Sequence, residues 1–243
     1  MRKALECLSN VASCLLGILL AYTLIAPCWD NGRIIQIVSA QGASINQQKY
    51  VEVEPVQPYQ AVRVIKVTIG TKEVIAGPFY PHREPTGVPF KAGDDWLKEL
   101  TFTVKNRTSK KVVQLFTDVC FPNPLEARSV ICQEVYLGRT PDIAAYMITG
   151  EKFDQGGKQP LDFLPGQEMT ISFAPYTDEL RRKIEEKEPF SAATRCFINV
   201  HYAYFEDGMS WLLSKFILPD TAHPGHQIDM DHSYFPGDLD ADK

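Results

Sequence analysis

Alternating apolar and polar residues in the middle of the chain predict two neighbouring β-strands. Along 100–105, leucine, phenylalanine and valine alternate with threonine and lysine, the period of two expected of a strand with one buried face. A polar break at 107–110 has the composition of a turn, and alternation resumes from Val113 to Val119. The two runs are typical of successive strands of a β-sandwich.

The same alternation marks further strands on both sides of this pair. They are expected at 61–69, 72–76, 130–137, 169–173, 195–205 and 209–218. Residues 70–71 and 206–208 fit tight hairpins, and the Pro-Gly centre of 164–167 fits a type II turn. Parity within 195–205 predicts that Ile198, Val200 and Tyr202 face the core.

Three segments depart from the β pattern. Thr177 is expected to cap a short connector helix with an acidic first turn, with Leu180 and Ile184 forming its apolar face. Prolines and glycines exclude a regular element over 77–93, after which Trp96 is expected to return the chain to the core. Residues 41–60 have no sustained apolar period and are predicted to be a linker or a loosely attached edge.

An uncharged apolar segment at the N-terminus predicts membrane targeting. Residues 8–27 are long enough to span a bilayer as a helix, and Arg2 and Lys3 favour a cytoplasmic N-terminus. The alternatives are a signal peptide cleaved near Ala40, lipidation at Cys14 or Cys28, and a buried core helix. Whether cleaved or retained, residues 1–40 would place the rest of the chain outside the cytoplasmic membrane.

If the rest of the chain lies outside the cytoplasm, two of its cysteines are expected to form a disulfide. Three of the six lie in the N-terminal segment, and Cys120, Cys132 and Cys196 lie in the expected exported part. Cys120 and Cys132 flank the connection between two predicted antiparallel strands, which favours a disulfide in an oxidising compartment. The alternative is two ordinary buried thiols.

Charge and motifs limit the classes of function. The formal net charge is −5, and loss of residues 1–40 removes three basic and two acidic residues, leaving −6. Since the chain has no basic cluster, nucleic acid is not an expected partner. The chain lacks a nucleophile elbow, a phosphate-binding loop, a dinucleotide fingerprint and a His-Glu-x-x-His motif. We therefore expect no enzymatic activity and no cofactor.

A histidine- and aspartate-rich segment near the C-terminus offers a candidate metal site. His223, His226 and Asp229 combine imidazole and carboxylate ligands that suit zinc, and carboxylates alone suit calcium. The spacing around Pro224-Gly225 matches no known metal motif. An ordinary solvated tail is the alternative.

Three other features invite a functional interpretation that structure alone can also explain. His201 would need an acid or nucleophile from another strand to act as a general base, and parity places Cys196 on the opposite face of its strand. Aromatic side chains could form a platform for a sugar, or they could pack in the core; these are Trp96, Tyr202, Tyr204 and Trp211. The triplet 106–108 is a glycosylation acceptor, but asparagine and threonine are also common in turns.

A family resemblance rests on strand and turn motifs. The run Asp-Asp-Trp-Leu-Lys-Glu-Leu-Thr-Phe-Thr-Val-Lys-Asn at 94–106 is similar to the first core strand of uncharacterised bacterial exported domains with an immunoglobulin-like sandwich. Leu-Pro-Gly-Gln at 164–167 and the hairpin at 204–208, followed by Trp211, are similar to later features of those proteins. The resemblance covers roughly 60–228 and implies the fold, but no functional residue.

Together these features predict a mainly β, immunoglobulin-like antiparallel sandwich at 61–228 with one short helix. A transmembrane or signal helix precedes it, and residues 229–243 form an acidic, disordered tail. The predicted function is a non-enzymatic binding or interaction module outside the cytoplasmic membrane, with an envelope protein or a glycan as partner. A metal-binding protein or metal-dependent hydrolase is the alternative, and a carbohydrate-binding module is a second one.

Overall fold

The computed structural model describes the greater part of the chain, in two compact units, residues 1–43 and 44–243. The described ranges are 29–30, 33–34, 47–57, 59–81, 83–123, 129–139, 159–212, 215–220, 222–223 and 226–230. In the first unit, β1 (Trp29–Asp30) pairs antiparallel with β2 (Arg33–Ile34). The predicted membrane segment 8–27, the cleavage site at Ala40 and the tail from residue 231 lie outside the described residues.

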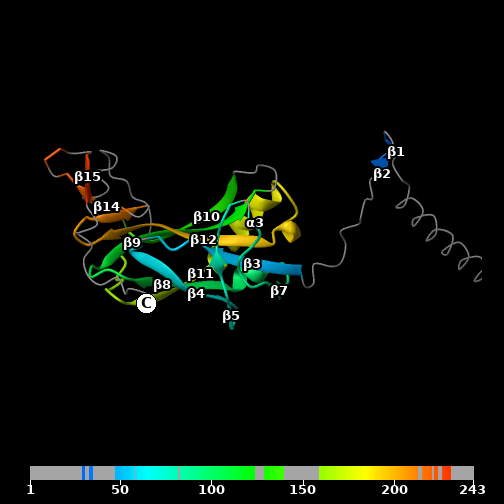
Figure 1. Cartoon of the computed structure of the whole chain (residues 1–243), viewed down its shortest axis with the longest axis horizontal. Coiled ribbons are helices and arrows are strands. Elements are labelled where there is room, and N and C mark those ends of the chain that lie inside the picture. Colours follow the sequence, from blue (N-terminus) through cyan, green and yellow to red (C-terminus); the bar gives the residue numbers. More distant parts are fainter. Residues whose placement is uncertain are drawn as a thin grey trace, which may run out of the picture. The chain divides into compact units, whose positions relative to one another are not determined.

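The second unit is mainly β, with two sheets in two layers (Figure 1). Within the described ranges, the large sheet has nine strands. Six of them run in the order β10 (Val130–Gly138), β9 (Val112–Pro122), β12 (Arg195–Phe205), β13 (Ser210–Leu212), β14 (Lys215–Pro219) and β15 (Gln227–Met230). The other three are β3 (Gln47–Val53), β6 (Gly77–Pro78) and β7 (Phe90–Ala92). The small sheet has the order β11 (Glu168–Ser172), β8 (Leu100–Asn106), β4 (Val62–Ile69) and β5 (Lys72–Val74).

The strands predicted by alternation form as expected in most of the second unit. β4 and β5 make the hairpin around Gly70, whose φ of 59° is one that glycine adopts without strain. Gly166 has φ 71°, and the Gln167 amide donates to the Leu164 carbonyl at 3.1 Å, as a type II turn requires. The successive strands β8 and β9 lie in different sheets, so the turn at 107–111 carries the chain from one layer to the other.

The core lies between the two sheets. Both layers contribute apolar side chains that are almost fully buried: Leu100, Phe102 and Val104 from β8, Leu115, Val119 and Phe121 from β9, and Ile198, Val200, Ala203 and Phe205 from β12. Trp96, in the 3-10 helix η1 (Trp96–Glu99), packs edge-on against Phe90 and Phe121. Each large side chain of this kind stabilises the fold by about 1.5–3 kcal/mol relative to exposure.

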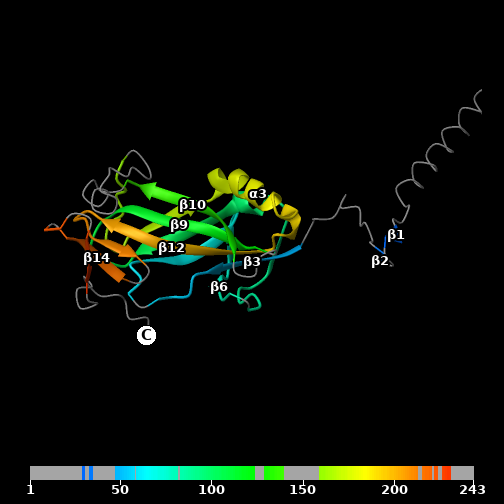
Figure 2. The ribbon, with the colours of Figure 1, turned by 90° about the horizontal axis from the view of Figure 1, so that it is seen from above.

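The predicted helix forms, but its predicted cap does not. Thr177 is the first residue of α3 (Thr177–Glu185) rather than its N-cap, and its hydroxyl donates to the Phe173 carbonyl at 3.3 Å. The chain reaches α3 through the 3-10 helix η2 (Ala174–Tyr176), so the preceding turn already has helical geometry. Leu180 and Ile184 are buried as predicted, and α3 packs beside β10 (Figure 2).

Residues 47–53 lie inside the range expected to be a linker, yet they form β3. This strand runs parallel to β12, with Tyr50 opposite Arg195 and Val53 opposite Ile198. Lys49 is 1% exposed and Glu52 is fully buried, so two buried charges interrupt the apolar pattern that identifies a strand. The segment 77–93, expected to be irregular, contributes the short strands β6 and β7.

The C-terminal part of the large sheet also differs from the prediction. The expected strand at 209–218 is divided into β13 and β14, which pair with each other. Ser214 and Lys215 interrupt its apolar residues, but without glycine, proline or asparagine they do not indicate a turn. Asp229 and Met230, expected to belong to the tail, form the end of β15. None of the helices in the described ranges has the length and hydropathy needed to cross a bilayer.

The open face of the large sheet

One face of the large sheet points away from the core and carries polar residues from adjacent strands. Asn199 of β12 lies opposite Asp118 of β9, and Asp118 lies opposite Glu134 of β10. Glu54 follows β3 directly, and its amide donates to the Ile198 carbonyl at 2.9 Å. We call Glu54, Asn199, Asp118 and Glu134 the acidic row.

A row of aromatic side chains lies next to the acidic row. It is formed by the next residues of β12, β9 and β10 that face the same side of the sheet. Tyr202 lies opposite Phe116, and Phe116 lies opposite Tyr136. The Phe116 ring stacks on Tyr136 with centroids 4.5 Å apart and on His201 at 4.8 Å, and it is tilted against Tyr202 at 5.0 Å. All four side chains are half-buried. We call Tyr202, Phe116, Tyr136 and His201 the aromatic row.

A β-bulge in β12 brings His201 to this face. The pairing with β9 shifts between Val200 and Tyr202, so His201 is the extra residue. Val200 faces the core, whereas His201 and Tyr202 both lie on the open face. The prediction that Tyr202 faces the core is therefore wrong, because parity holds only up to the bulge.

His201 and Asp118 form the polar centre of the face. The His201 Nε2 lies 2.6 Å from Asp118 Oδ2, and Asn199 Nδ2 donates to Asp118 Oδ1 at 2.9 Å. The Asp118 side chain is 7% exposed and the His201 side chain 32%. The hydrogen bond to Asp118 raises the pKa of His201, burial opposes this, and the charges of Asp118, Glu54 and Glu134 add to it. The arrangement therefore favours an imidazolium paired with a carboxylate.

The carboxylates at the two ends of the acidic row, Glu54 and Glu134, are hydrogen-bonded to neutral side chains. Gln57 Nε2 donates to Glu54 at 2.6 Å, and burial raises the pKa of Glu54, which the His201 charge partly offsets. The Tyr136 hydroxyl donates to Glu134 at 3.0 Å. Burial, together with the Glu134 carboxylate, raises the pKa of Tyr136 to about 12, so Tyr136 remains a neutral donor. Glu134 itself is exposed.

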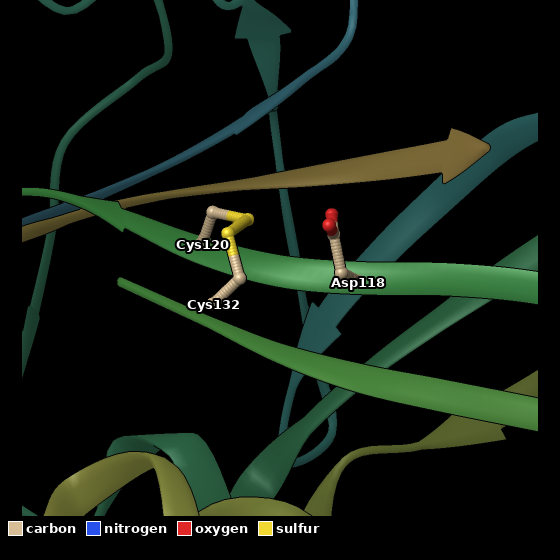
Figure 3. A group of neighbouring side chains, drawn as sticks. All are labelled: Asp118, Cys120 and Cys132. Carbon is tan, nitrogen blue, oxygen red and sulfur yellow. A yellow bond between two sulfur atoms is a disulfide. The ribbon is translucent and has the colours of Figure 1, made fainter. Parts of the chain in front are cut away.

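The predicted cysteine pair lies beside the acidic row. Cys120 and Cys132 are directly opposite each other in β9 and β10, with their sulfur atoms at disulfide distance and their Cα atoms 4.1 Å apart. Figure 3 shows the Asp118 carboxylate projecting to the same side as the two sulfurs. In the described residues these three form the one group with three candidate ligand atoms within reach of one ion. Because the sulfurs are bonded to each other, they offer no thiolate to a metal.

Cys196 is free and lies on the opposite face of β12. It is fully buried, and burial raises the pKa of its thiol. The expectation that Cys196 and His201 do not form a pair is confirmed, since the two residues lie on different sides of the sheet.

The face is covered at the start of β12 by a segment that we call the strap, residues 79–81 and 83–87. Phe79 stacks on Phe197 with centroids 3.7 Å apart. Arg195 Nε donates to the buried Glu52 carboxylate at 2.6 Å, and the Thr86 amide donates to the same carboxylate at 3.0 Å. The strap therefore closes one end of the face, and the acidic and aromatic rows lie beyond it.

The structure does not gather the predicted metal ligands around one point. His223 Nδ1 lies 2.9 Å from Asp220 Oδ2, and its ring centroid is 6.1 Å from that of His226. Asp229 accepts from Lys215 Nζ at 2.9 Å. The metal hypothesis stays a prediction, and calorimetric titration with zinc and calcium tests it.

The predicted sugar platform is not assembled. Trp96 and Trp211 are 2% and 1% exposed and belong to the core, so neither presents a ring face to solvent. Tyr202 and Tyr204 lie on the open face with centroids 5.2 Å apart. The four side chains therefore share no surface.

Asn106 of the glycosylation triplet is fully buried. Its Nδ2 donates to the carbonyls of Lys110 and Phe163 at 2.8 and 3.0 Å, and its Oδ1 accepts from the amide and hydroxyl of Thr108. Asparagine and threonine here build the turn between the two layers, and the folded protein does not present Asn106 as a glycan acceptor.

A separate cleft of about 290 Å³ lies beside β4, β5 and β7. Ile69, Val74, Phe90 and Trp96 give it an apolar lining, and Lys72, Lys91, Asp95 and Glu99 lie around it. Both signs of charge surround the cleft, so its lining favours no particular class of ligand.

No pattern in the sequence predicts the two rows directly. Each row is formed by strands far apart in the chain, and its members become neighbours only through strand register. The bulge that exposes His201 also depends on pairing with β9. Comparison with protein-family models, curated proteins and solved structures finds no match for this chain.

Proposed function

We propose that this protein is a non-enzymatic binding module outside the cytoplasmic membrane, and that it binds its partner through the open face of the large sheet. The observation that carries the proposal is the acidic row next to the half-buried aromatic row. Aromatic side chains are enriched at the centres of interaction surfaces, and polar groups form the rims around them.

Energetics support a binding role for this face. Asp118 is largely removed from water and paired with His201, and such pairs commonly contribute little net stability because desolvation offsets the attraction. Phe116 and Tyr136 project from the open face and remain only half-buried, so their rings keep exposed apolar surface. A face that only packs against the rest of the fold would not need a buried ion pair beside half-buried aromatic rings.

The strand order supports the finer fold proposal. β4, β8 and β11 are neighbours in one layer, and β10, β9, β12 and β13 are neighbours in the other. This is the order of strands A, B and E opposite strands C′, C, F and G in an immunoglobulin-like sandwich. We propose this assignment, with the parallel strand β3 as an addition beside β12.

The cysteine pair and the apolar segment at 8–27 support the proposed location. Disulfides persist in oxidising compartments. In this proposal the N-terminal segment anchors the chain or is cleaved near Ala40, and the second unit lies outside the cytoplasmic membrane.

Photo-crosslinking in cells tests the proposal. A photoreactive amino acid at Tyr136 is expected to capture a defined partner, whereas the same group at the exposed Ser172 of β11 serves as a matched control. Capture from Tyr136 without capture from Ser172 supports the open face. Equal capture from both positions, or none from Tyr136, contradicts it.

A further inference from the structure

We propose that the partner of the open face is an extended peptide segment with two basic side chains, which bind Glu54 and Glu134 at the two ends of the acidic row. This inference rests on the proposed function and specifies its partner. It follows from the charge of the face, from the spacing of the carboxylates and from the adjacent rings.

The negative charge of the open face favours a partner with cationic groups. Glu54, Asp118 and Glu134 carry three negative charges when ionised, and the His201 imidazolium carries one positive charge. His201 and Asn199 already occupy the Asp118 carboxylate. In the described residues, Glu54 and Glu134 accept hydrogen bonds from the neutral groups of Gln57 and Tyr136, and the His201 cation, bonded to Asp118, only partly offsets the charge of Glu54. Anionic membranes and nucleic acids would be repelled by this surface.

The spacing of the two ends suits an extended peptide. Glu54 and Glu134 are separated by three strand-to-strand intervals, from β3 through β12 and β9 to β10. With neighbouring strands about 4.8 Å apart, the ends lie roughly 14 Å from each other. Residues i and i+4 of an extended chain are about 13–14 Å apart and point to the same side. Two basic residues at i and i+4 therefore match both ends.

The aromatic row adds a contact that favours arginine. Along a strand, side chains on one face repeat about every 6.6 Å, so a guanidinium bound at Glu134 comes close to the Tyr136 and Phe116 rings. Guanidinium groups attract aromatic rings within about 6 Å. The same fold already uses this contact, because Arg195 lies over the Phe79 ring at 4.9 Å and Arg181 over the Phe190 ring at 4.6 Å.

Calorimetric titration of the full-length chain with short peptides tests the inference. The probe is acetyl-Arg-Ser-Ala-Ser-Arg-amide, and its matched control carries citrulline, the uncharged isostere, at both arginine positions. We expect saturable binding of the arginine peptide and at least a tenfold weaker affinity for the citrulline peptide. A peptide with adjacent arginines should bind at least threefold more weakly than the probe, because it cannot reach both ends.

Protein variants locate the binding. Glu134→Gln and Glu54→Gln should each weaken the probe at least fivefold, whereas Glu168→Gln on the small sheet should leave its affinity unchanged. Glu134 and Glu168 are both exposed, so neither change is expected to affect folding. Glu134→Arg should recover binding to a peptide in which one arginine is replaced by glutamate.

Several outcomes would overturn the inference. These are no saturable binding of the probe, equal affinity for the citrulline peptide, equal affinity for spermidine, or an equal effect of Glu168→Gln. If the probe does not bind but photo-crosslinking from Tyr136 captures a partner, the basic-peptide inference fails and the proposed function stands. If neither assay gives a signal, both fail.

Discussion

Two carboxylates on the same face of the large sheet are paired with basic side chains in opposite environments. Glu52 and Arg195 lie beneath the strap, where Glu52 is fully buried and also accepts from Thr86. Asp118 and His201 lie in the open rows, where the His201 side chain is 32% exposed. The basic member is less exposed in the first pair, since the Arg195 side chain is 18% exposed and the His201 side chain 32%.

The difference between the two pairs indicates a structural role for Glu52 and Arg195 and a binding role for the open rows. The Glu52–Arg195 pair fixes the strap, since Arg195 also donates to the carbonyls of Arg83 and Tyr80 at 2.8 and 3.3 Å. Both members of this pair are bonded to further groups of the chain. In the open rows, Glu134 is exposed and its partner is a phenol. Stability should therefore respond strongly to changes under the strap, and binding should respond to changes in the rows.

The largest expected effect is from Glu52→Gln. The change leaves Arg195 without its anion in a mostly buried position, and loss of one partner of a buried ion pair costs about 3–5 kcal/mol. Because Arg195 keeps its two carbonyl acceptors, we expect a loss near the lower end of that range, measured by urea unfolding. Glu134→Gln is the matched control in the open rows and should change the free energy of unfolding by less than about 0.5 kcal/mol. Equal losses in the free energy of unfolding for Glu52→Gln and Glu134→Gln would contradict the distinction between the strap and the open rows.

The next effect concerns the cysteine pair at the border of the two regions. Cys120 and Cys132 are separated by 12 residues, and removal of a disulfide that closes a loop of this size costs about 3 kcal/mol from loop-closure entropy. Cys120→Ser with Cys132→Ser should lower the free energy of unfolding by this amount, measured by denaturant titration. Cys196→Ser is the control for sulfur removal without a bridge. If intact protein alkylated under denaturing conditions shows no mass difference with and without reduction, the bridge is absent.

The sequence predicted the strands better than it predicted the face they form. Alternation identified β8, β9 and β12 because each buries one side against the core. The alternation does not identify β3, since the buried charges of Lys49 and Glu52 break the apolar period, and most of their partners are distant in the sequence. The acidic row could not be predicted, because register between β3, β12, β9 and β10 is set by tertiary pairing.

A smaller effect is expected from Asp118→Asn in the open rows. Asparagine keeps the shape of the side chain and an oxygen for the Asn199 amide, but it loses the charge that pairs with His201. Loss of a charge-assisted hydrogen bond at a partly exposed site should cost about 1–2 kcal/mol, measured by urea unfolding. Asn199→Ala is a control that removes the hydrogen bond from a neutral donor while the ion pair with His201 remains. A loss as large as that of Glu52→Gln would show that the open rows are as structural as the strap.

The smallest effect is the pH dependence of the His201 contribution. Its pKa is raised in the folded protein above the ordinary value of 6.5, chiefly by the hydrogen bond to Asp118. The folded state therefore binds the proton more tightly than the unfolded state, so the stabilisation is fully present below about pH 6.5 and is lost as pH rises through the folded pKa. Asp118, Glu54 and Glu134 act in the same direction, and the neutral Tyr136 hydroxyl adds no charge in this range.

His201→Gln isolates this contribution. The difference in free energy of unfolding between the wild type and the variant should be largest at about pH 6 and should shrink towards pH 9, since only the wild type loses a proton there. Fluorescence-monitored urea titrations at several pH values measure it, and the NMR titration of the His201 ring gives its pKa directly. A constant difference across this range, or a ring pKa at or below 6.5, would mean that Asp118 does not hold the proton on His201. The open rows would then lose their one cation near neutral pH, and the acidic row would attract a basic partner more strongly.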